Sequence, residues 1–323
     1  MTEKFAWVVT DGKAGMVAQA RGLAEAVGLP IVDKTIVLSR PCRWLPPVLW
    51  PHSLFGGIVG VARESDPIEP PWPNLLISCG RNAVGPALAV KRRSNGHTFI
   101  VHVQHPRVNP ERFDIVAAPA HDGLSGANVM TIQGAFNRAT PASLATAAAQ
   151  AAPIVSHLPR PLVAVLIGGS NRSYRLTPQT ISNLADNLAK LAHEHGAGLM
   201  VTPSRRTGTD NEALLRLKLA DLPTVFWDQK DDNPYFGYLG LAHAIVVTPD
   251  SVNMVSEACS TGKAVYIAEM EGGDAKFDRF HRGLSEAGMT RPFVGALENW
   301  QYTALDDTTP VATAIRRRLY LED

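Results

Sequence analysis

The chain has 323 residues, which is too long for one ordinary hydrophobic core and predicts two domains of roughly 150 residues each. Its 31 Lys and Arg residues against 30 Asp and Glu residues give a net charge of +1, which argues against a protein that coats nucleic acid. The three cysteines lie far apart and include no CxxC pair, so we predict neither a disulfide framework nor a zinc knuckle.

The N-terminal residues MTEKFAWVVT lead directly into a strand-like run and lack the features of a signal peptide. The chain also contains no run of about 18 uncharged apolar residues that would predict a membrane span. We therefore expect a cytoplasmic protein.

Short apolar runs rich in β-branched residues alternate with helical patterns along the first half of the chain. This alternation is typical of a parallel sheet that is covered on both faces. We expect strands at 5–10, 35–38, 74–80, 98–104, 113–119 and 129–134, with helices that include Gly15–Val27 and Ala83–Arg92.

An Ala-rich helix expected at 140–152 is followed by PIVSHLPRP (153–161), a proline-rich segment that predicts an inter-domain hinge. The alternating pattern then restarts. We expect strands at 162–169, 198–204, 224–228, 244–248 and 264–269, with helices near 177–195, 210–219, 234–242 and 251–260.

These elements predict an α/β protein with two Rossmann-like, doubly wound domains. The first domain is expected at 1–155 and the second at 156–304, and a last helix within 305–323 is expected to pack back on the first domain. Open parallel sheets bind ligands beyond the carboxyl ends of their strands. Residues that directly follow strands are therefore the candidates for a site, and a cleft between two such domains is the default place for it.

The first candidate loop is TDGKAG (10–15), which joins a strand to a helix. Gly12 allows a tight turn, and the helix start behind Lys13 offers N–H groups to an anion. The loop is neither a GxGxxG fingerprint nor a Walker A loop. Asp11 is a candidate general base, or alternatively a simple cap of the turn.

The second group follows two neighbouring strands. Arg81 ends one strand, and Gln104, His105 and Arg107 end the next, so all four side chains are expected to face one cleft. His105 is a candidate catalytic or acceptor-binding residue, or alternatively a structural histidine. His102 and His105 lie on opposite faces of an extended strand, and we predict no metal site from them.

The third group opens the second domain. Gly169 and Ser170 form a turn after an apolar strand that would admit a phosphate, and Arg205 and Arg206 follow the next strand. Arginines that are simply solvated at the surface are the alternative interpretation.

The fourth stretch is TPDSVNMVSEACSTGK (248–263), a short helix between two strands. Asp250 or Ser251 can cap its first N–H groups, and Gly262 stops it. Asp250, Asn253 and Glu257 share one narrow helical face, which places Glu257 to accept hydrogen bonds from a vicinal diol such as a ribose. The alternative is that Glu257 is a solvated helix residue.

The chain resembles the mitochondrial-fission factor family of plants and its bacterial relatives from about Trp7 to Pro292. The segments that carry the resemblance are SCGRNAVGPA, VHVQHPR, FDIVAAPAHD, LIGG, SRRTG, VVTPDSVNMVSEACSTGK and KFDRFHRGLSEAGMTRPF. Bacterial members look like glycosyltransferases of the GT-B fold, in which two Rossmann-like domains face each other across a cleft. The resemblance therefore implies a nucleotide-sugar donor in the C-terminal domain.

The wider GT-B resemblance implies roles for particular residues. Glu257 would hold the ribose, while Ser251, Asn253 and Ser170 would lie near the pyrophosphate. Gly12, Lys13, Arg81, Gln104 and Arg107 would form the acceptor side. Transferases of this kind carry a histidine in the first glycine loop, which TDGKAGMVAQ lacks, so Asp11 or His105 must act as the base.

Our main functional hypothesis is a metal-independent GT-B glycosyltransferase without a cofactor, in which Arg205 and Arg206 stabilise the leaving diphosphate. The acceptor is expected to be a lipid-linked or envelope glycan, because the segment 40–63 has tryptophans, basic ends and an apolar middle suited to a membrane surface. This would place the protein peripherally at the inner face of the cell membrane. A loop packed on its own domain is the alternative for 40–63.

Two further functions are consistent with the sequence. The first is a non-catalytic scaffold or adaptor at a membrane surface, as the plant relatives suggest. The second is a nucleotide-sugar epimerase of similar fold.

Overall fold

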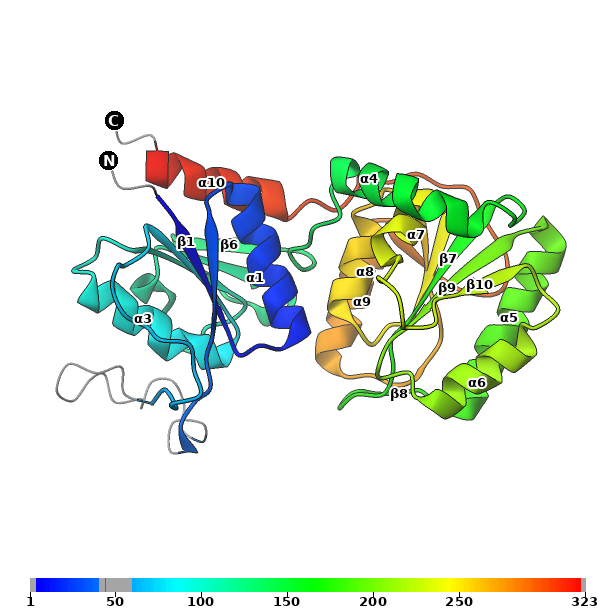
Figure 1. The fold of residues 1–323 in the computed structure, drawn as a ribbon, viewed down its shortest axis with the longest axis horizontal. Helices are drawn as coiled ribbons and strands as arrows, with labels where there is room; N and C mark the ends of the chain where they lie inside the picture. The colour runs from blue at the N-terminus through cyan, green and yellow to red at the C-terminus, as the bar shows by residue number, and fades with distance from the viewer. Residues whose placement is uncertain (1–3, 41–43, 45–59, 321–323) are drawn as a thin grey trace. The chain divides into compact units, whose positions relative to one another are not determined.

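A computed structural model of the chain describes residues 4–40, 44 and 60–320 (Figure 1). The chain folds into two compact units. The first runs to Asn137 and resumes at Asp306, and the second extends from Arg138 to Leu305.

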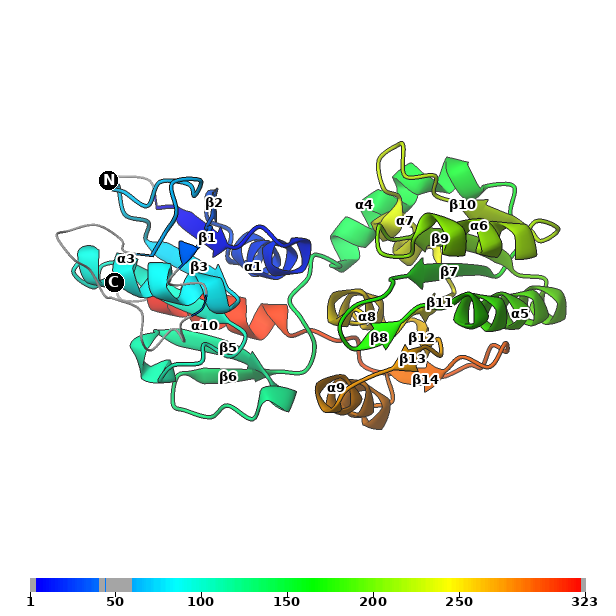
Figure 2. The same cartoon turned by 90° about the horizontal axis from the view of Figure 1, so that it is seen from below.

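The first unit is built on six parallel strands in the order β2-β1-β3-β4-β5-β6 (Figures 1 and 2). Helices α1 and α10 pack on one face of this sheet and α3 packs on the other, so the inner strands are buried on both sides. The elements are β1 (Ala6–Thr10), α1 (Ala14–Val27), β2 (Ile31–Thr35), β3 (Leu75–Cys79), α3 (Val84–Arg93), β4 (Phe99–Val103), β5 (Ile115–Pro119), β6 (Val129–Ile132) and α10 (Thr308–Tyr320). Short 3₁₀ turns follow β3, β4 and β5 at Arg81–Ala83, Pro110–Arg112 and Ala120–Asp122.

The prediction of the second strand at 35–38 was wrong. The strand is Ile31–Thr35, and it pairs with β1 alone at the edge of the sheet. An edge strand is half solvated, which explains why this strand carries the polar pair Asp33-Lys34 and gave no apolar signal. Leu38, which the pattern favoured, instead forms an isolated antiparallel bridge with Val61.

The second unit is built on six parallel strands in the order β10-β9-β7-β11-β12-β14. Helices α5 and α6 pack on one face, and α4, α7, α8 and α9 pack on the other (Figure 2). The elements are α4 (Pro141–Ala151), a 3₁₀ turn (Ala152–Val155), β7 (Leu162–Ile167), β8 (Tyr174–Arg175), α5 (Pro178–His195), β9 (Gly198–Pro203), α6 (Thr209–Lys218), β10 (Thr224–Phe226), α7 (Tyr235–Leu241), β11 (Ala244–Val247), α8 (Val252–Cys259), β12 (Ala264–Ile267), β13 (Glu271–Gly272), α9 (Ala275–Glu286) and β14 (Thr290–Pro292).

Helix α9 and strand β14 were not among the predicted elements. The sequence nevertheless carries a helix signal, because the Asp274 side chain accepts the N–H groups of Lys276 and Phe277, and Phe280 and Leu284 are buried at helical spacing. Strand β14 has three residues, two of them exposed, so its apolar pattern is too short to detect.

Helix α4 belongs to the second unit rather than to the first, so the chain divides at Asn137 and not at the predicted residue 155. The reason is its close packing on α7. A methyl group added to Gly237 would lie 2.4 Å from the β-carbon of Ala151, and one added to Gly240 would lie 2.5 Å from the carbonyl oxygen of Leu144. The two glycines therefore allow the two helices to approach closely. No helix of the described residues is long and apolar enough to cross a membrane.

The contact between α4 and α7 makes a testable prediction about stability. Gly237→Ala and Gly240→Ala should each lower the free energy of unfolding by about 1–3 kcal/mol, because the added methyl overlaps a neighbouring helix. Gly283→Ala, in α9, is the matched control, since a methyl there meets no atom within 4 Å, and it should be neutral or stabilising by up to about 1 kcal/mol. Urea unfolding measures all three, and equal effects at the three sites would contradict the packing argument.

Candidate functional site

In both sheets the chain changes direction beside its first strand. Strand β1 lies between β2 and β3, and strand β7 lies between β9 and β11. Ligands of open parallel sheets bind beyond the carboxyl ends of the strands at such switch points. The loops after β1 and β3, and those after β7, β9 and β11, are therefore where a site is expected in each unit.

The carboxyl edge of the second unit is organised by Asp250, whose side chain is 0% exposed. Its Oδ2 accepts the backbone N–H of Gly169 at 3.0 Å and pairs with Nη2 of Arg206 at 2.7 Å. Its Oδ1 accepts the hydroxyl of Thr248 at 2.7 Å. One carboxylate therefore joins the loops that follow β7, β9 and β11.

The glycines of the turn after β7 are required by this packing. A methyl group on Gly168 would lie 2.1 Å from Oδ1 of Asp250, and one on Gly169 would lie 1.9 Å from the carbonyl oxygen of Arg206. The predicted phosphate contact through Gly169 needs correction, because its N–H is already donated to Asp250. Ser170 is likewise engaged, since its hydroxyl accepts the N–H of Leu176 at 2.9 Å.

The two arginines after β9 have different surroundings. Arg206 is held by Asp250 while 43% of its side chain stays exposed, so much of its charge is neutralised by a buried partner. Arg205 is exposed and lines a cleft. Arg205 is therefore the better placed of the two to meet an anionic ligand.

Helix α8 and its N-cap carry the remaining residues that are predicted to bind the nucleotide sugar. Ser251 is its N-cap and accepts the N–H of Met254 at 3.4 Å, and Asn253 is half-buried in the first turn. Glu257 is only 9% exposed, and the hydroxyl of Tyr235 donates to its Oε2 at 2.6 Å. Burial raises the pKa of Glu257 to about 7, although the hydrogen bond from Tyr235 opposes the rise.

The contact with Tyr235 is a feature of the candidate site that the sequence did not reveal. Tyr235 is the first residue of α7, and the signal in the sequence is the preceding Asn233-Pro234 pair, which marks a helix start directly after the loop that follows β10. The helix near 234–242 was predicted, but the contact between Tyr235 and Glu257 was not.

A cleft of about 400 Å³ opens beside this pair. It is formed by the ends of β7, β9 and β10 together with the starts of α7 and α8, within the size range of small-molecule sites. Its lining residues are Ile167, Thr202, Pro203, Ser204, Arg205, Trp227, Gln229, Asn233, Tyr235 and Met254. Tyr235 thus forms a wall of the cleft and also bonds to Glu257.

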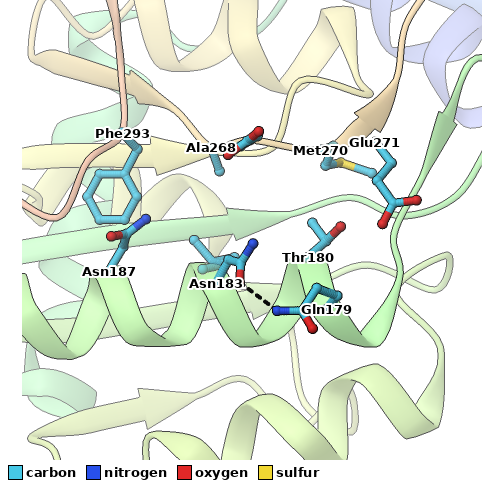
Figure 3. Close-up of a pocket in the computed structure, with 10 residues that line it drawn as sticks. Gln179, Thr180, Asn183, Asn187, Ala268, Met270, Glu271 and Phe293 are labelled. Carbon is cyan, nitrogen blue, oxygen red and sulfur yellow. Dashed lines mark hydrogen bonds between the residues drawn. The ribbon is translucent and has the colours of Figure 1, made fainter.

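Two other hollows of the second unit fit a nucleotide less well. The pocket in Figure 3 lies between α5 and the segment after β12, where Gln179 donates to Asn183 at 2.8 Å, and its volume of about 100 Å³ is too small. The hollow of about 470 Å³ between α9 and β14 is lined by apolar residues such as Phe293 and Val294 and by as many polar ones, such as Glu269 and Arg282. The loops after β7 and β9 contribute to neither pocket.

The carboxyl edge of the first unit brings Asp11 and Asn82 together at the switch point between β1 and β3. The amide of Asn82 donates to Oδ2 of Asp11 at 3.1 Å, and Lys13 forms an ion pair with the same oxygen. The backbone N–H of Lys13 approaches Oδ1 at a longer distance of 3.4 Å. Oδ1 of Asp11 is therefore the less engaged of the two oxygens, and Asn82 is a site residue that the sequence did not single out.

The turn after β4 orients the ring of His105 and determines its tautomer. Gln104 and Arg107 on either side of it have φ values of 80° and 61°, a conformation that residues other than glycine rarely adopt and that is often found at functional sites. The N–H of Arg107 donates to Nδ1 of His105 at 3.0 Å. The neutral imidazole therefore carries its proton on Nε2 and presents a donor.

The remaining predicted residues lie at the same edge. Gly12 has a φ of 75° and donates its N–H to the hydroxyl of Thr10, and Arg81 is exposed at the start of the 3₁₀ turn after β3. Within the described ranges, no group of three or more His, Cys, Asp or Glu side chains is arranged so that it could hold a metal ion. Most of the predicted membrane-facing segment 40–63 lies outside the described residues.

The fold is the GT-B fold that glycosyltransferases and nucleotide-sugar epimerases share. A UDP-N-acetylglucosamine 2-epimerase from Listeria monocytogenes, described as putative, superposes with a TM-score of 0.61 at 11% identity, covering 99% of this chain and 98% of that one. The epimerase of Methanocaldococcus jannaschii, solved in complex with UDP-GlcNAc and UDP, has a TM-score of 0.51 at 10% identity, covering 98% and 99% of the two chains.

The sequence comparison identifies the family. The chain belongs to the mitochondrial fission ELM1 family, whose model matches residues 14–319. The mitochondrial fission protein ELM1 of Arabidopsis thaliana is 33% identical over 290 residues, which are 81% of this chain and 67% of that protein. The resemblance noted in the sequence is therefore confirmed.

The Asp250 network predicts a large effect on stability. Asp250→Ala should lower the free energy of unfolding by about 2–4 kcal/mol, because it leaves the N–H of Gly169 and the charge of Arg206 without their buried partner. Asp186→Ala is the control, since it removes a 69% exposed carboxylate from a surface ion pair and should cost under about 1 kcal/mol. Urea unfolding provides the comparison, and similar losses would contradict a central role for Asp250.

Glu257 predicts a pH dependence of stability. Because burial raises its pKa from 4.5 to about 7, the folded protein binds more protons than the unfolded chain between these values. The protonated Glu257 side chain therefore contributes up to about 3 kcal/mol to the free energy of unfolding. This contribution is complete below pH 4.5 and is lost as the pH rises through about 7. Glu257→Gln should remove that slope in urea unfolding, whereas Glu194→Gln, at an exposed position, should retain it.

Proposed function

We propose that the protein is a glycosyltransferase that takes its sugar from a nucleotide-sugar donor bound to the second unit. The observation that supports this function best is the cleft of about 400 Å³ at the carboxyl edge. Tyr235 forms a wall of this cleft and is hydrogen-bonded to the buried Glu257. A nucleoside needs a partly apolar cleft for its base and a carboxylate for its ribose diol.

The donor would be held by three sets of groups. The base would enter the cleft beside Trp227, and Glu257 would accept hydrogen bonds from the ribose. The diphosphate would meet Arg205 and the start of α8 near Ser251 and Asn253, where helix N–H groups and a guanidinium stabilise negative charge. As the sugar is transferred, the same groups would stabilise the charge that develops on the leaving diphosphate.

The base that activates the acceptor is proposed to be Asp11. Oδ2 of this carboxylate is held by Asn82 and Lys13, while Oδ1 is less engaged and can accept the proton of an acceptor hydroxyl. The tautomer that Arg107 imposes on His105 favours the same choice, because Nε2 of the neutral imidazole is a donor. His105 is then better suited to bind the acceptor than to deprotonate it.

The proposed acceptor is a lipid-linked or envelope glycan at the inner face of the cell membrane. The tryptophans and the apolar middle of the segment 40–63 support this proposal. Lys13, Arg81, Gln104 and Arg107 would provide the polar contacts of the acceptor, together with the backbone of Gly12.

Calorimetric titration with UDP, GDP, ADP and CMP tests the donor site. At least one nucleotide should bind, and Glu257→Ala should weaken its binding about tenfold or more, because a buried carboxylate that bonds two hydroxyls is lost. Glu194→Ala, on the exposed side of α5, should leave the affinity unchanged. The absence of heat with all four nucleotides would overturn the proposed donor site.

Turnover distinguishes the candidate functions. With a nucleotide sugar that binds and a glycan or water as the acceptor of the sugar, we expect release of the free nucleotide. Asp11→Asn should abolish this release while leaving nucleotide affinity intact. An altered but still nucleotide-linked sugar would instead identify an epimerase. Liposome association that persists in Glu257→Ala and Arg205→Ala, without any turnover, would favour the scaffold.

A further inference from the structure

The position of Tyr235 is fixed by the start of helix α7. The side chain of Asn233 accepts the N–H of Tyr235 at 3.0 Å, and the Tyr235 ring packs edge-on against Phe236 with centroids 5.3 Å apart. Both contacts restrain the backbone and the ring plane. The phenolic hydroxyl is therefore presented to Glu257 from a defined place.

The rest of α7 is also held. Gly237 and Gly240 pack against α4 without space for a methyl group, and Nζ of Lys263 donates to the carbonyl oxygens of Leu239 and Gly240 at 2.7 and 2.5 Å. A helix restrained along one face and at its C-terminal end cannot slide or turn easily. The hydrogen bond between Tyr235 and Glu257 thus joins α8 to a helix, α7, whose position is fixed.

The contact with Tyr235 uses one acceptor position of the Glu257 carboxylate and leaves the others to a ligand. The Tyr235 hydroxyl donates one hydrogen bond to Oε2, and an ionised carboxylate has about four acceptor positions. The remaining positions can accept the 2′- and 3′-hydroxyls of a ribose. A 2′-deoxyribose would leave one of these positions unmatched in a buried site, which lowers affinity.

Other polar groups around α8 are engaged elsewhere. Lys263 donates to the C-terminal carbonyls of α7, and the hydroxyl of Tyr302 donates to the carbonyl oxygens of Lys263 and Cys259. Cys259, on the same helix, is a buried thiol. The Tyr235 hydroxyl, by contrast, donates its hydrogen bond to the Glu257 carboxylate beside the cleft.

We propose that Tyr235 is a positioning residue that fixes the Glu257 carboxylate for a ribose diol, so that the site selects ribonucleotides over 2′-deoxyribonucleotides. This inference rests on the proposed donor site in the second unit. Tyr235 would therefore influence the selectivity without touching the ribose, because it orients the side chain of Glu257.

Calorimetry with UDP and dUDP, extended to the ADP, GDP and CDP pairs, tests the inference on the whole chain. The wild-type protein should prefer the ribonucleotide by about tenfold or more, the size expected for one hydrogen bond to a charged group. Tyr235→Phe should reduce this preference to within about threefold, mainly by weakening the binding of the ribonucleotide. Tyr238→Phe, one turn further along the same helix, is the matched control and should keep the preference.

The pH profile gives a second readout that a purely structural role would not change. Ribonucleotide affinity should rise with pH as Glu257 ionises near its pKa of about 7. In Tyr235→Phe the midpoint should move to higher pH, because the hydrogen bond that favours the charged form is missing. In a Glu257→Gln background, Tyr235→Phe should have no further effect on the preference, which also guards against a variant that merely folds poorly.

The outcomes separate the inference from the donor site itself. Tighter ribonucleotide binding by Tyr235→Phe would show that Tyr235 blocks the carboxylate, and it would overturn the positioning role. Unchanged selectivity in a variant that still binds UDP would overturn the inference while the donor site stands. If no nucleotide binds to the wild-type protein, both proposals fail.

Discussion

The structure of the candidate donor site depends on one buried carboxylate. A charged group out of contact with water is tolerated only when donors and a counterion surround it. Asp250 meets this requirement with the N–H of Gly169, the hydroxyl of Thr248 and the guanidinium of Arg206. Because these three partners follow three different strands, satisfying one charge fixes the relative positions of the loops at the carboxyl edge. The two glycines of the first loop follow from the same constraint, since a methyl group at Gly168 would overlap the carboxylate.

Once Asp250 is satisfied, the neighbouring Glu257 has a different chemistry. Asp250 has an arginine partner, whereas Glu257 is hydrogen-bonded by a phenol that carries no charge at neutral pH. Burial without a cation raises the pKa of Glu257 to about 7, and an incoming polar ligand with two hydroxyls could compensate the buried charge. Two carboxylates on one short segment thus differ in their surroundings: Asp250 holds the loops, and Glu257 is the one for which we propose a ligand. Environment, not residue type, makes the difference.

The sequence predicts this fold well where strands are buried on both faces. Runs such as LVAVLI in β7 are apolar at every position because α-helices cover both sides of the sheet. The same reasoning fails at the edges, where β2 carries Asp33 and Lys34 and β14 is only three residues long. The candidate site divides in a similar way. The glycine turn and α8 are local patterns, but the Tyr235–Glu257 contact spans 22 residues of sequence and depends on how α4, α7 and α8 pack, which no local pattern encodes.

The first unit repeats the switch-point arrangement with a different balance of burial. Asp11 and Asn82 join the loops after β1 and β3, much as Asp250 joins loops in the second unit. The side chain of Asp11 stays 13% exposed and its partner Lys13 is 72% exposed, so water and ligands can reach this pair. Asp250 is closed off and can only hold structure, whereas Asp11 keeps an oxygen that is weakly engaged. Proton transfer requires such an accessible, oriented carboxylate, which is why we propose Asp11 as the base and Glu257 as the residue that binds the donor.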